Sequence, residues 1–497
     1  MEQKITQFNN YKKIMHALSH LNGVLYFDAA TSAPKGSYIS RATTTEYLSG
    51  EMFSLLTSPE TIDLVNYLLE NNDKIDKQTH RECVLVKREL DKLLKMPKEE
   101  FVEYQVLLNE SSSIWEKAKK TNDYNLFKPY LKKIIEFNIK MAAYIDPKKQ
   151  PYDALLGQFE YGFSTKDYDP YFKSMQESLV PTILAINEAG QPDSSFLDLS
   201  YPIYKQRELS DRVMALLGID REYCNISESE HPFTTNFSKY DVRITTHYHE
   251  NMMASSLYSV IHEGGHAIYE LNTADEYQYG PLASGTSLGL HESQSRFYEN
   301  IIGRSREFMT LLLPILKELF PNEFENVNED MLYRALNIAK PSLIRTEADE
   351  LTYSMHVLIR YELEKQLIAG TLSVDDAAQA WKDMYKSYLG VNVPDDTTGI
   401  LQDSHWAGGA FGYFPTYSIG SAYSSQIKNA IEKEFSVNEA IQSGNISKIT
   451  KWLNENIHKH GSMYDPKEIL QLSCKEDFIP QYYFDYLNNK FKALYNL

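Results

Sequence analysis

The spacing of hydrophobic residues predicts helices along most of the chain. In the first 145 residues, hydrophobic side chains recur every three or four positions, as they do from Cys83 to Leu94, and this is the period of one helix face. Prolines follow Ser58 and Met96, where the first turn of a helix tolerates them. This part of the chain is therefore predicted to be helical.

One segment departs from the helical period. Residues 231–247 carry Phe, Thr, Val and Ile in near-alternation, which favours extended strands. Helices are predicted to resume after it, with one opening at Ser373–Asp376 and closing at Gly390, and others following from Tyr423 onward. The sequence thus predicts a mainly α protein with a small β-sheet near the segment that carries the candidate site.

A cluster of Pro and Lys at residues 146–151 interrupts the helical pattern. It lacks Gly and Ser, so we interpret it as a joint and not as a flexible linker. We expect a helical N-terminal region, 1–150, and a helical catalytic region, 151–497, as subdomains of one unit.

Charge and cysteine content narrow the functional classes. The 50 Lys and Arg against 68 Asp and Glu give a net charge of −18, which disfavours nucleic acid and anionic membranes as partners. No apolar stretch of about eighteen residues occurs, and the N-terminus lacks a signal-peptide core. Three dispersed cysteines, at 83, 224 and 474, fit neither a disulfide framework nor a cysteine metal site. We expect a reduced, cytoplasmic protein.

The most specific chemical signal is the pentad from His262 to His266, inside a predicted helix. Positions four apart lie on one face, so two imidazoles can bind one ion of the size of zinc. Glu263 can reach a water molecule at that ion as a general base. Gly264 and Gly265 each cost a helix about 1 kcal/mol relative to Ala. Their presence predicts a close approach of another backbone or of a substrate.

A catalytic zinc needs a third protein ligand and one open position. After a loop rich in Gly, Pro and Ser, a second helix is predicted to begin near His291 and Glu292. Glu292 is the preferred third ligand. His291 is its competitor, because neighbours on a helix differ by about 100° and cannot both face the ion. Glu270 and Glu299 are expected to be outer partners of the ligands or solvent-facing residues.

Six separated motifs, in order and spacing, resemble those of the carboxypeptidase Taq family of metallocarboxypeptidases. They span about residues 230–420 and are His231-Pro232-Phe233, Asp241-Val-Arg243-Ile-Thr245, His262–His266, His291–Ser295, Ile344–Asp349 and Gly399–Trp406, the last followed by Gly412–Tyr417. In a segment where the family tends to have an acidic residue and Pro, this chain has Gly157 and Tyr161.

The resemblance implies an almost wholly helical fold with a deep active-site groove, a homodimer, and peptide substrates that lose single C-terminal residues with broad tolerance. Carried over motif by motif, it makes His262, His266 and Glu292 the ligands of one divalent metal ion, and Glu263 the base. Zinc is expected, with cobalt and manganese as alternatives, since two His and a carboxylate accept all three.

Peptide hydrolysis also needs donors for the tetrahedral oxyanion. His405, Tyr413 and Tyr417 lie in or beside a Gly-rich stretch that lets side chains crowd a cleft. His405 and Tyr417 are candidate catalytic residues, and Tyr413 is a candidate for substrate binding. The alternative for each Tyr is a place at the edge of the core.

Recognition of a chain end calls for a fixed cation, best supplied by a planar Arg fork. Arg345 and Arg243 are the candidates, and His231 joins them as a possible substrate-binding residue through its motif. The alternatives are structural: Arg345 could pair with Asp349, four residues on in a predicted helix, and Arg243 with Asp241.

Three other functions remain open at the level of sequence. An oligoendopeptidase or a peptidyl-dipeptidase could use the same metal site on a similar scaffold. A helical peptide-binding protein could keep the metal as a structural clip. Glu263 argues against the clip, because a structural site fills all four positions with ligands and needs no base.

Overall fold

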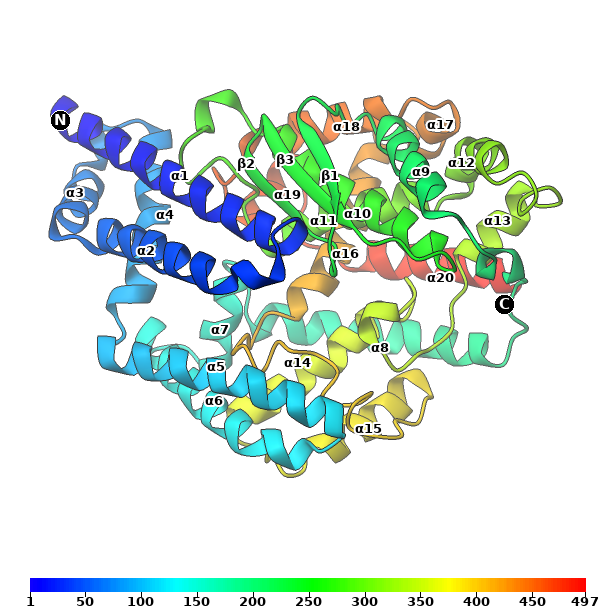
Figure 1. Cartoon of the computed structure of the whole chain (residues 1–497), viewed down its shortest axis with the longest axis horizontal. Helices are drawn as coiled ribbons and strands as arrows, with labels where there is room; N and C mark the ends of the chain where they lie inside the picture. The colour runs from blue at the N-terminus through cyan, green and yellow to red at the C-terminus, as the bar shows by residue number, and fades with distance from the viewer.

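The computed structural model describes residues 1–497 and is built almost entirely of helices (Figure 1). Its α-helices in the first half are α1 (Glu2–Thr31), α2 (Tyr38–Thr57), α3 (Pro59–Glu70), α4 (Lys77–Leu94), α5 (Lys98–Thr121), α6 (Tyr124–Ile145), α7 (Pro151–Phe159), α8 (Thr165–Asn187) and α9 (Ile203–Leu216). Those in the second half are α10 (Met253–Leu271), α11 (Leu288–Arg296), α12 (Arg306–Leu319), α13 (Glu329–Leu336), α14 (Tyr353–Ala369), α15 (Ala377–Leu389), α16 (Pro415–Glu432), α17 (Val437–Gln442), α18 (Ile446–Asn456), α19 (Pro466–Cys474) and α20 (Gln481–Tyr495). The predicted helical class is confirmed, and no helix has both the length and the apolar character needed to cross a membrane.

A single three-stranded sheet has the order β1-β3-β2. The predicted strand region forms β2 (Thr234–Ser238) and β3 (Asp241–Thr246), which pair antiparallel. Strand β1 (Cys224–Glu228) pairs parallel to β3 and was not predicted. Its sequence, CNISE, is short and mostly polar, so it lacks the alternation by which a strand is found.

The first helices have a small core of their own. Eight buried residues of α1, α3 and α4 form a cluster separate from the main core, while α5 and α6 pack into the main core. Helix α1 runs beside β2 (Figure 1), and the ring of Phe237 lies against Gly23. The predicted joint falls between the end of α6 and the start of α7. That the first 150 residues form a unit stays a prediction.

Helices α10, α11 and α16 meet at the centre of the molecule (Figure 1). A Cβ at Gly265 would lie 2.7 Å from the Gln294 carbonyl oxygen of α11, so the close backbone approach predicted for this glycine is confirmed. Gly420 of α16 likewise allows a close approach to α11, since a Cβ there would lie 2.7 Å from the Glu292 side chain. Side-chain-free positions thus let three helices close around Glu292.

Two predicted elements differ from the structure. Helix α11 changes after Arg296 into a π-helix, Phe297–Gly303, whose wider turn is often found at functional sites. The segment 344–349 is not the predicted helix: only Arg345–Glu347 form a short 3-10 turn. Asp349 accepts hydrogen bonds from the backbone N–H groups of Leu351 and Thr352, which shapes the turn into α14.

Candidate active site

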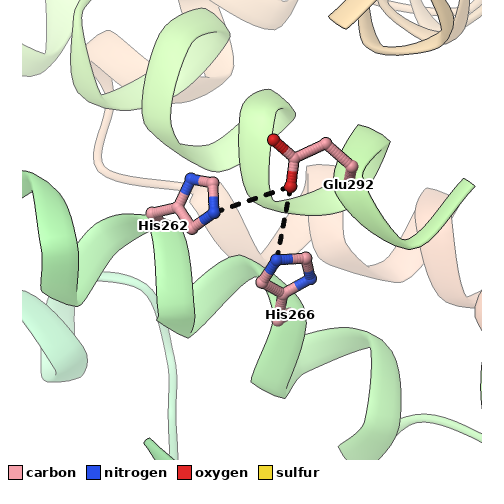
Figure 2. Close-up of side chains that lie close together, drawn as sticks. All are labelled: His262, His266 and Glu292. Atoms are coloured by element: carbon pink, nitrogen blue, oxygen red, sulfur yellow. Dashed lines mark ion pairs between the residues drawn. The ribbon is translucent and has the colours of Figure 1, made fainter. Parts of the chain in front are cut away.

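Two turns of α10 and one of α11 bring three potential metal ligands together (Figure 2). Nε2 of His262 lies 3.6 Å from Glu292 Oε2, and Nε2 of His266 lies 3.5 Å from the same oxygen. Zinc bonds of about 2.0–2.1 Å in a tetrahedron separate neighbouring ligand atoms by about 3.4 Å. These two distances therefore fit a zinc-sized ion, and all three donor atoms lie within 4.8 Å of one another.

Hydrogen bonds fix which nitrogen of His262 is free. Its Nδ1–H donates to Glu299 Oε2 at 2.8 Å, which leaves the lone pair of Nε2 for a metal. Arg296 Nη1 and Arg304 Nη2 also donate to Glu299, at 3.1 and 3.3 Å. Burial would raise the pKa of Glu299, but the Arg296 charge and the contact with His262 hold that pKa well below its usual range. Glu299 is thus a buried, anionic partner of His262, one of the three potential ligands.

His266 is oriented by a relay of two residues. Glu270 Oε1 lies 2.6 Å from Nε2 of His291, and Nδ1 of His291 lies 2.6 Å from Nδ1 of His266. Because the carboxylate accepts the His291 proton, Nδ1 of His291 accepts from His266 and leaves the Nε2 lone pair of His266 free. His291, the competitor for third ligand, contacts Glu270 and the Nδ1 atom of His266 and does not belong to the group of three potential ligands.

The two oxygens of the Glu292 carboxylate have different partners. Arg296 Nε donates to Oε1 at 2.7 Å, while Oε2 faces the two histidines and accepts from Ser295 Oγ at 3.0 Å. Burial works to raise the pKa of Glu292, but the Arg296 charge and the His262 ring hold it well below its usual value. Glu292 is therefore ionised and has one oxygen directed at the metal position.

Glu263 lies next to the ligands and is only 7% exposed. Its Oε2 accepts a hydrogen bond of 2.6 Å from Thr234 Oγ1, which also donates to the Glu263 carbonyl oxygen at 3.1 Å. Strand β2 thus sets the orientation of this carboxylate, and the sheet lies near the site as predicted.

The candidate oxyanion donors form an aromatic group at the start of α16. Tyr417 Oη is 3.5 Å from His405 Nε2, and the rings of Tyr413 and Tyr417 meet edge to face with centroids 5.3 Å apart. Burial, together with the nearby Arg345 charge, lowers the pKa of His405 to about 4. Burial raises the pKa of Tyr417. Near neutral pH, His405 is therefore uncharged and Tyr417 keeps its proton.

Arg345 is 6% exposed and held by partners far along the chain. Its Nε and Nη2 donate to Asp403 Oδ1 at 3.0 and 2.9 Å, and the fully buried Arg360 donates to the other oxygen. The structural alternative for Arg345, a pair with Asp349 within one helix, is wrong, because the segment is not helical and Asp349 accepts hydrogen bonds from backbone N–H groups. A third bond, from Nη1 to the Tyr353 hydroxyl, leaves one N–H on each of Nη1 and Nη2 without a hydrogen bond within the protein.

Arg243 and His231, the other two candidates for substrate binding by charge, are not held as Arg345 is. Arg243 forms a two-pronged pair with Asp241 at 2.8 Å for each bond, and its guanidinium also stacks on the rings of Phe27 and Phe237. This is the structural alternative considered for Arg243. His231 is exposed, and its carbonyl oxygen accepts from Ser229 Oγ.

A cavity of about 400 Å³ opens beside the ligand cluster. Its walls include His262, Arg296, Glu299, Arg304 and Tyr353. It gathers charged and aromatic groups beside His262, together with Glu299, which contacts Nδ1 of that histidine.

Sequence reasoning missed several residues of this site. Thr234, Asp403 and Tyr353 contact candidate residues only through the folded structure. The one available signal concerned Arg296, which lies four residues after Glu292 on the predicted second helix, at the spacing of a helical ion pair.

Comparisons with known proteins agree with these features. Residues 7–491 match the model of a family described as carboxypeptidase Taq (M32) metallopeptidase. The chain is 39% identical over 492 residues to Carboxypeptidase 1 of Bacillus subtilis, covering 99% of this chain and 98% of that protein. It is 36% identical to Thermostable carboxypeptidase 1 of Pyrococcus furiosus, covering 97% of each. The crystal structure of M32 carboxypeptidase from Deinococcus radiodurans superposes with a TM-score of 0.97 at 31% identity, over 100% of both chains.

Proposed function

The chain belongs to the carboxypeptidase Taq (M32) metallopeptidase family and is a metallocarboxypeptidase, and we propose that it releases single C-terminal residues from peptides with broad side-chain tolerance. The observation that chiefly supports the residue assignments is the cluster of His262, His266 and Glu292 at metal-ligand spacing. We assign the metal to these three side chains.

A divalent metal ion bound there supplies a Lewis acid that polarises the scissile carbonyl group and makes a water molecule more acidic. We propose zinc as this ion, with cobalt and manganese as alternatives that the same donors accept. Glu299 and the Glu270–His291 pair hold the two imidazoles in the tautomer that leaves each Nε2 free.

Glu263 takes the proton from the attacking water and later gives it to the leaving amine. Thr234 supports this role because its hydroxyl keeps the carboxylate in one orientation beside the ligands. Tyr417 and His405 donate to the oxygen that becomes negative as the carbonyl carbon turns tetrahedral. Tyr413 packs on Tyr417 and is assigned to substrate contact.

Arg345 binds the terminal carboxylate of the peptide. Three of its N–H donors are engaged by Asp403 and Tyr353, and the free edge between Nη1 and Nη2 suits a two-pronged contact with a carboxylate. We rank Arg345 above Arg243, whose fork is already occupied by Asp241. His231 is kept as a weaker candidate because its side chain is exposed.

We further propose that the peptide lies in a groove that includes the cavity beside His262, and that the protein is a cytoplasmic homodimer. The family resemblance supports the groove and the dimer, and the three dispersed cysteines, all buried and free, support the reducing compartment. The division into residues 1–150 and 151–497 is part of the same proposal.

Digestion of a mixed pool of peptides, followed by mass spectrometry, tests the direction of cutting. Ladders that shorten by one residue from the C-terminus are expected, across many side chains. Fragments from the middle of a chain would favour the oligoendopeptidase, and residues released in pairs would favour the peptidyl-dipeptidase. Intact peptides in the presence of bound metal would favour the peptide-binding protein.

A further inference from the structure

Tyr353 lies between the metal ligands and Arg345. It is the first residue of α14, is 8% exposed, and lines the cavity beside His262. Arg345 Nη1 donates to its hydroxyl at 3.2 Å, and the guanidinium of Arg296 lies 4.4 Å from its ring centroid. The hydroxyl and the ring therefore contact different arginines.

The hydroxyl has a proton to give. Its oxygen accepts from Arg345 and makes no other hydrogen bond to the protein, so the O–H has no acceptor of its own. Accepting from a cation also polarises a hydroxyl and strengthens it as a donor. A carboxylate bound at the free edge of Arg345 would lie next to this proton.

The ring acts on the other arginine. Arg296 is the residue that holds Glu292 Oε1, at 2.7 Å, and it also contacts Glu299. An aromatic face against a partly desolvated guanidinium is stabilising and restricts its position. The ring of Tyr353 thus supports the arginine that orients the third ligand, without touching the ligand itself.

We infer that Tyr353 is a specificity-determining residue that positions Arg345 and donates its free proton to the terminal carboxylate, while its ring steadies Arg296. The inference rests on the proposed recognition of that carboxylate by Arg345. It separates two properties within one side chain: the hydroxyl acts on recognition of the chain end, and the ring acts on the metal ligands.

Two substitutions separate these properties. Tyr353→Phe removes the hydroxyl and keeps the ring, whereas Tyr353→Leu removes both. For Tyr353→Phe we expect KM for a free-acid peptide to rise about tenfold, with kcat changed less, because a hydrogen bond to a charged group is lost. The rate ratio between the free-acid and the amidated peptide should shrink to a similar extent. Metal affinity, measured by competition with a chelator, should stay within twofold of the parent.

Tyr353→Leu should show the same loss of discrimination and, in addition, metal affinity weakened about fivefold, the scale of one cation–π contact. Tyr204→Phe, at a Tyr that is 65% exposed, is the matched control and should change neither quantity. Thermal unfolding of every variant checks that the fold is kept.

The outcomes distinguish this inference from the proposed function. If the parent cleaves free-acid and amidated peptides equally well, recognition of the terminal carboxylate itself is wrong. If the parent discriminates and Tyr353→Phe discriminates equally, only the role of the hydroxyl is overturned. If Tyr353→Leu binds metal as tightly as Tyr353→Phe, the role of the ring is overturned.

Discussion

Two buried charge networks border the site, and they differ in how far apart their members lie in the sequence. Glu292, Arg296 and Glu299 are joined within eight consecutive residues of α11 and the π-helix. Arg345, Arg360 and Asp403 are joined over separations of 43 and 58 residues. The first network includes Glu292, the proposed third metal ligand, and the second includes Arg345, the cation proposed for the peptide end. The residues of the first network lie on one continuous helical segment, whereas those of the second come together only when several segments of the chain pack against one another.

The difference predicts separable effects. Damage to the local network should act on metal binding, and damage to the long-range network should act on recognition of the substrate, with the metal left in place. Substitutions in each network test this separation.

Glu292→Ala should abolish stable metal binding and reduce activity at least about a hundredfold, because a ligand is removed and Arg296 loses one of its two carboxylate partners. His291→Ala should retain the metal, although more weakly, since His291 acts through His266. Metal analysis of both purified proteins decides between them. A metal-free His291 variant beside a metal-replete Glu292 variant would reverse the assignment.

Glu299→Gln should weaken metal affinity about 10- to 100-fold, the range for residues that orient a ligand. The amide is a neutral acceptor for the His262 N–H group. It also removes the negative charge that Glu299 sets against Arg296 and Arg304. Chelator competition measures the affinity. An affinity equal to that of the parent would mean that the tautomer of His262 is set without Glu299.

Arg345→Ala should lower kcat/KM for free-acid peptides about thirtyfold and leave amidated peptides nearly unchanged. Metal content should equal that of the parent, which is the point of contrast with Glu299→Gln. Equal losses on both kinds of peptide would show that Arg345 acts through the fold and not on the carboxylate.

The smallest expected effect concerns pH. Burial and the Arg345 charge depress the pKa of His405 to about 4, from an ordinary value of 6.5. The unfolded chain therefore binds this proton first as pH falls, so stability present above pH 6.5 is lost progressively down to about pH 4. Between pH 6.5 and 4.5 this residue should account for about 2 kcal/mol.

His405→Gln should remove that contribution. Urea unfolding of parent and variant at both pH values compares the two losses, and the other titrating groups cancel in the difference. An equally steep loss of stability in His405→Gln would show that His405 is not protected from protonation in the folded state.

The sequence predicted what single helices determine. His262 and His266 share a face of α10 by helical spacing alone, and the glycines beside them predicted the contact with α11 that Gly265 makes. Glu292 followed from the need for a third ligand and from the length of the intervening chain. The helical class and the strands β2 and β3 followed from the period of the hydrophobic residues.

What failed depended on packing between distant segments. The structural alternative for Arg345 was a pair with Asp349 in a helix, but its carboxylate partner, Asp403, is 58 residues away. Thr234 reaches Glu263 only because β2 packs beside α10, and no local pattern marks it. Tyr353 could not be predicted, because its contacts with Arg345 and Arg296 form only when α14 packs beside both. Strand β1 was missed because its few residues are mostly polar.

The central claim is that Glu263 is the general base beside a metal held by other residues. Glu263→Gln keeps the size of the side chain and its contact with Thr234 but cannot take the proton of the attacking water. We expect metal content equal to that of the parent and kcat at least about a hundredfold lower on a free-acid peptide. Turnover within tenfold of the parent, at unchanged metal content, would contradict it.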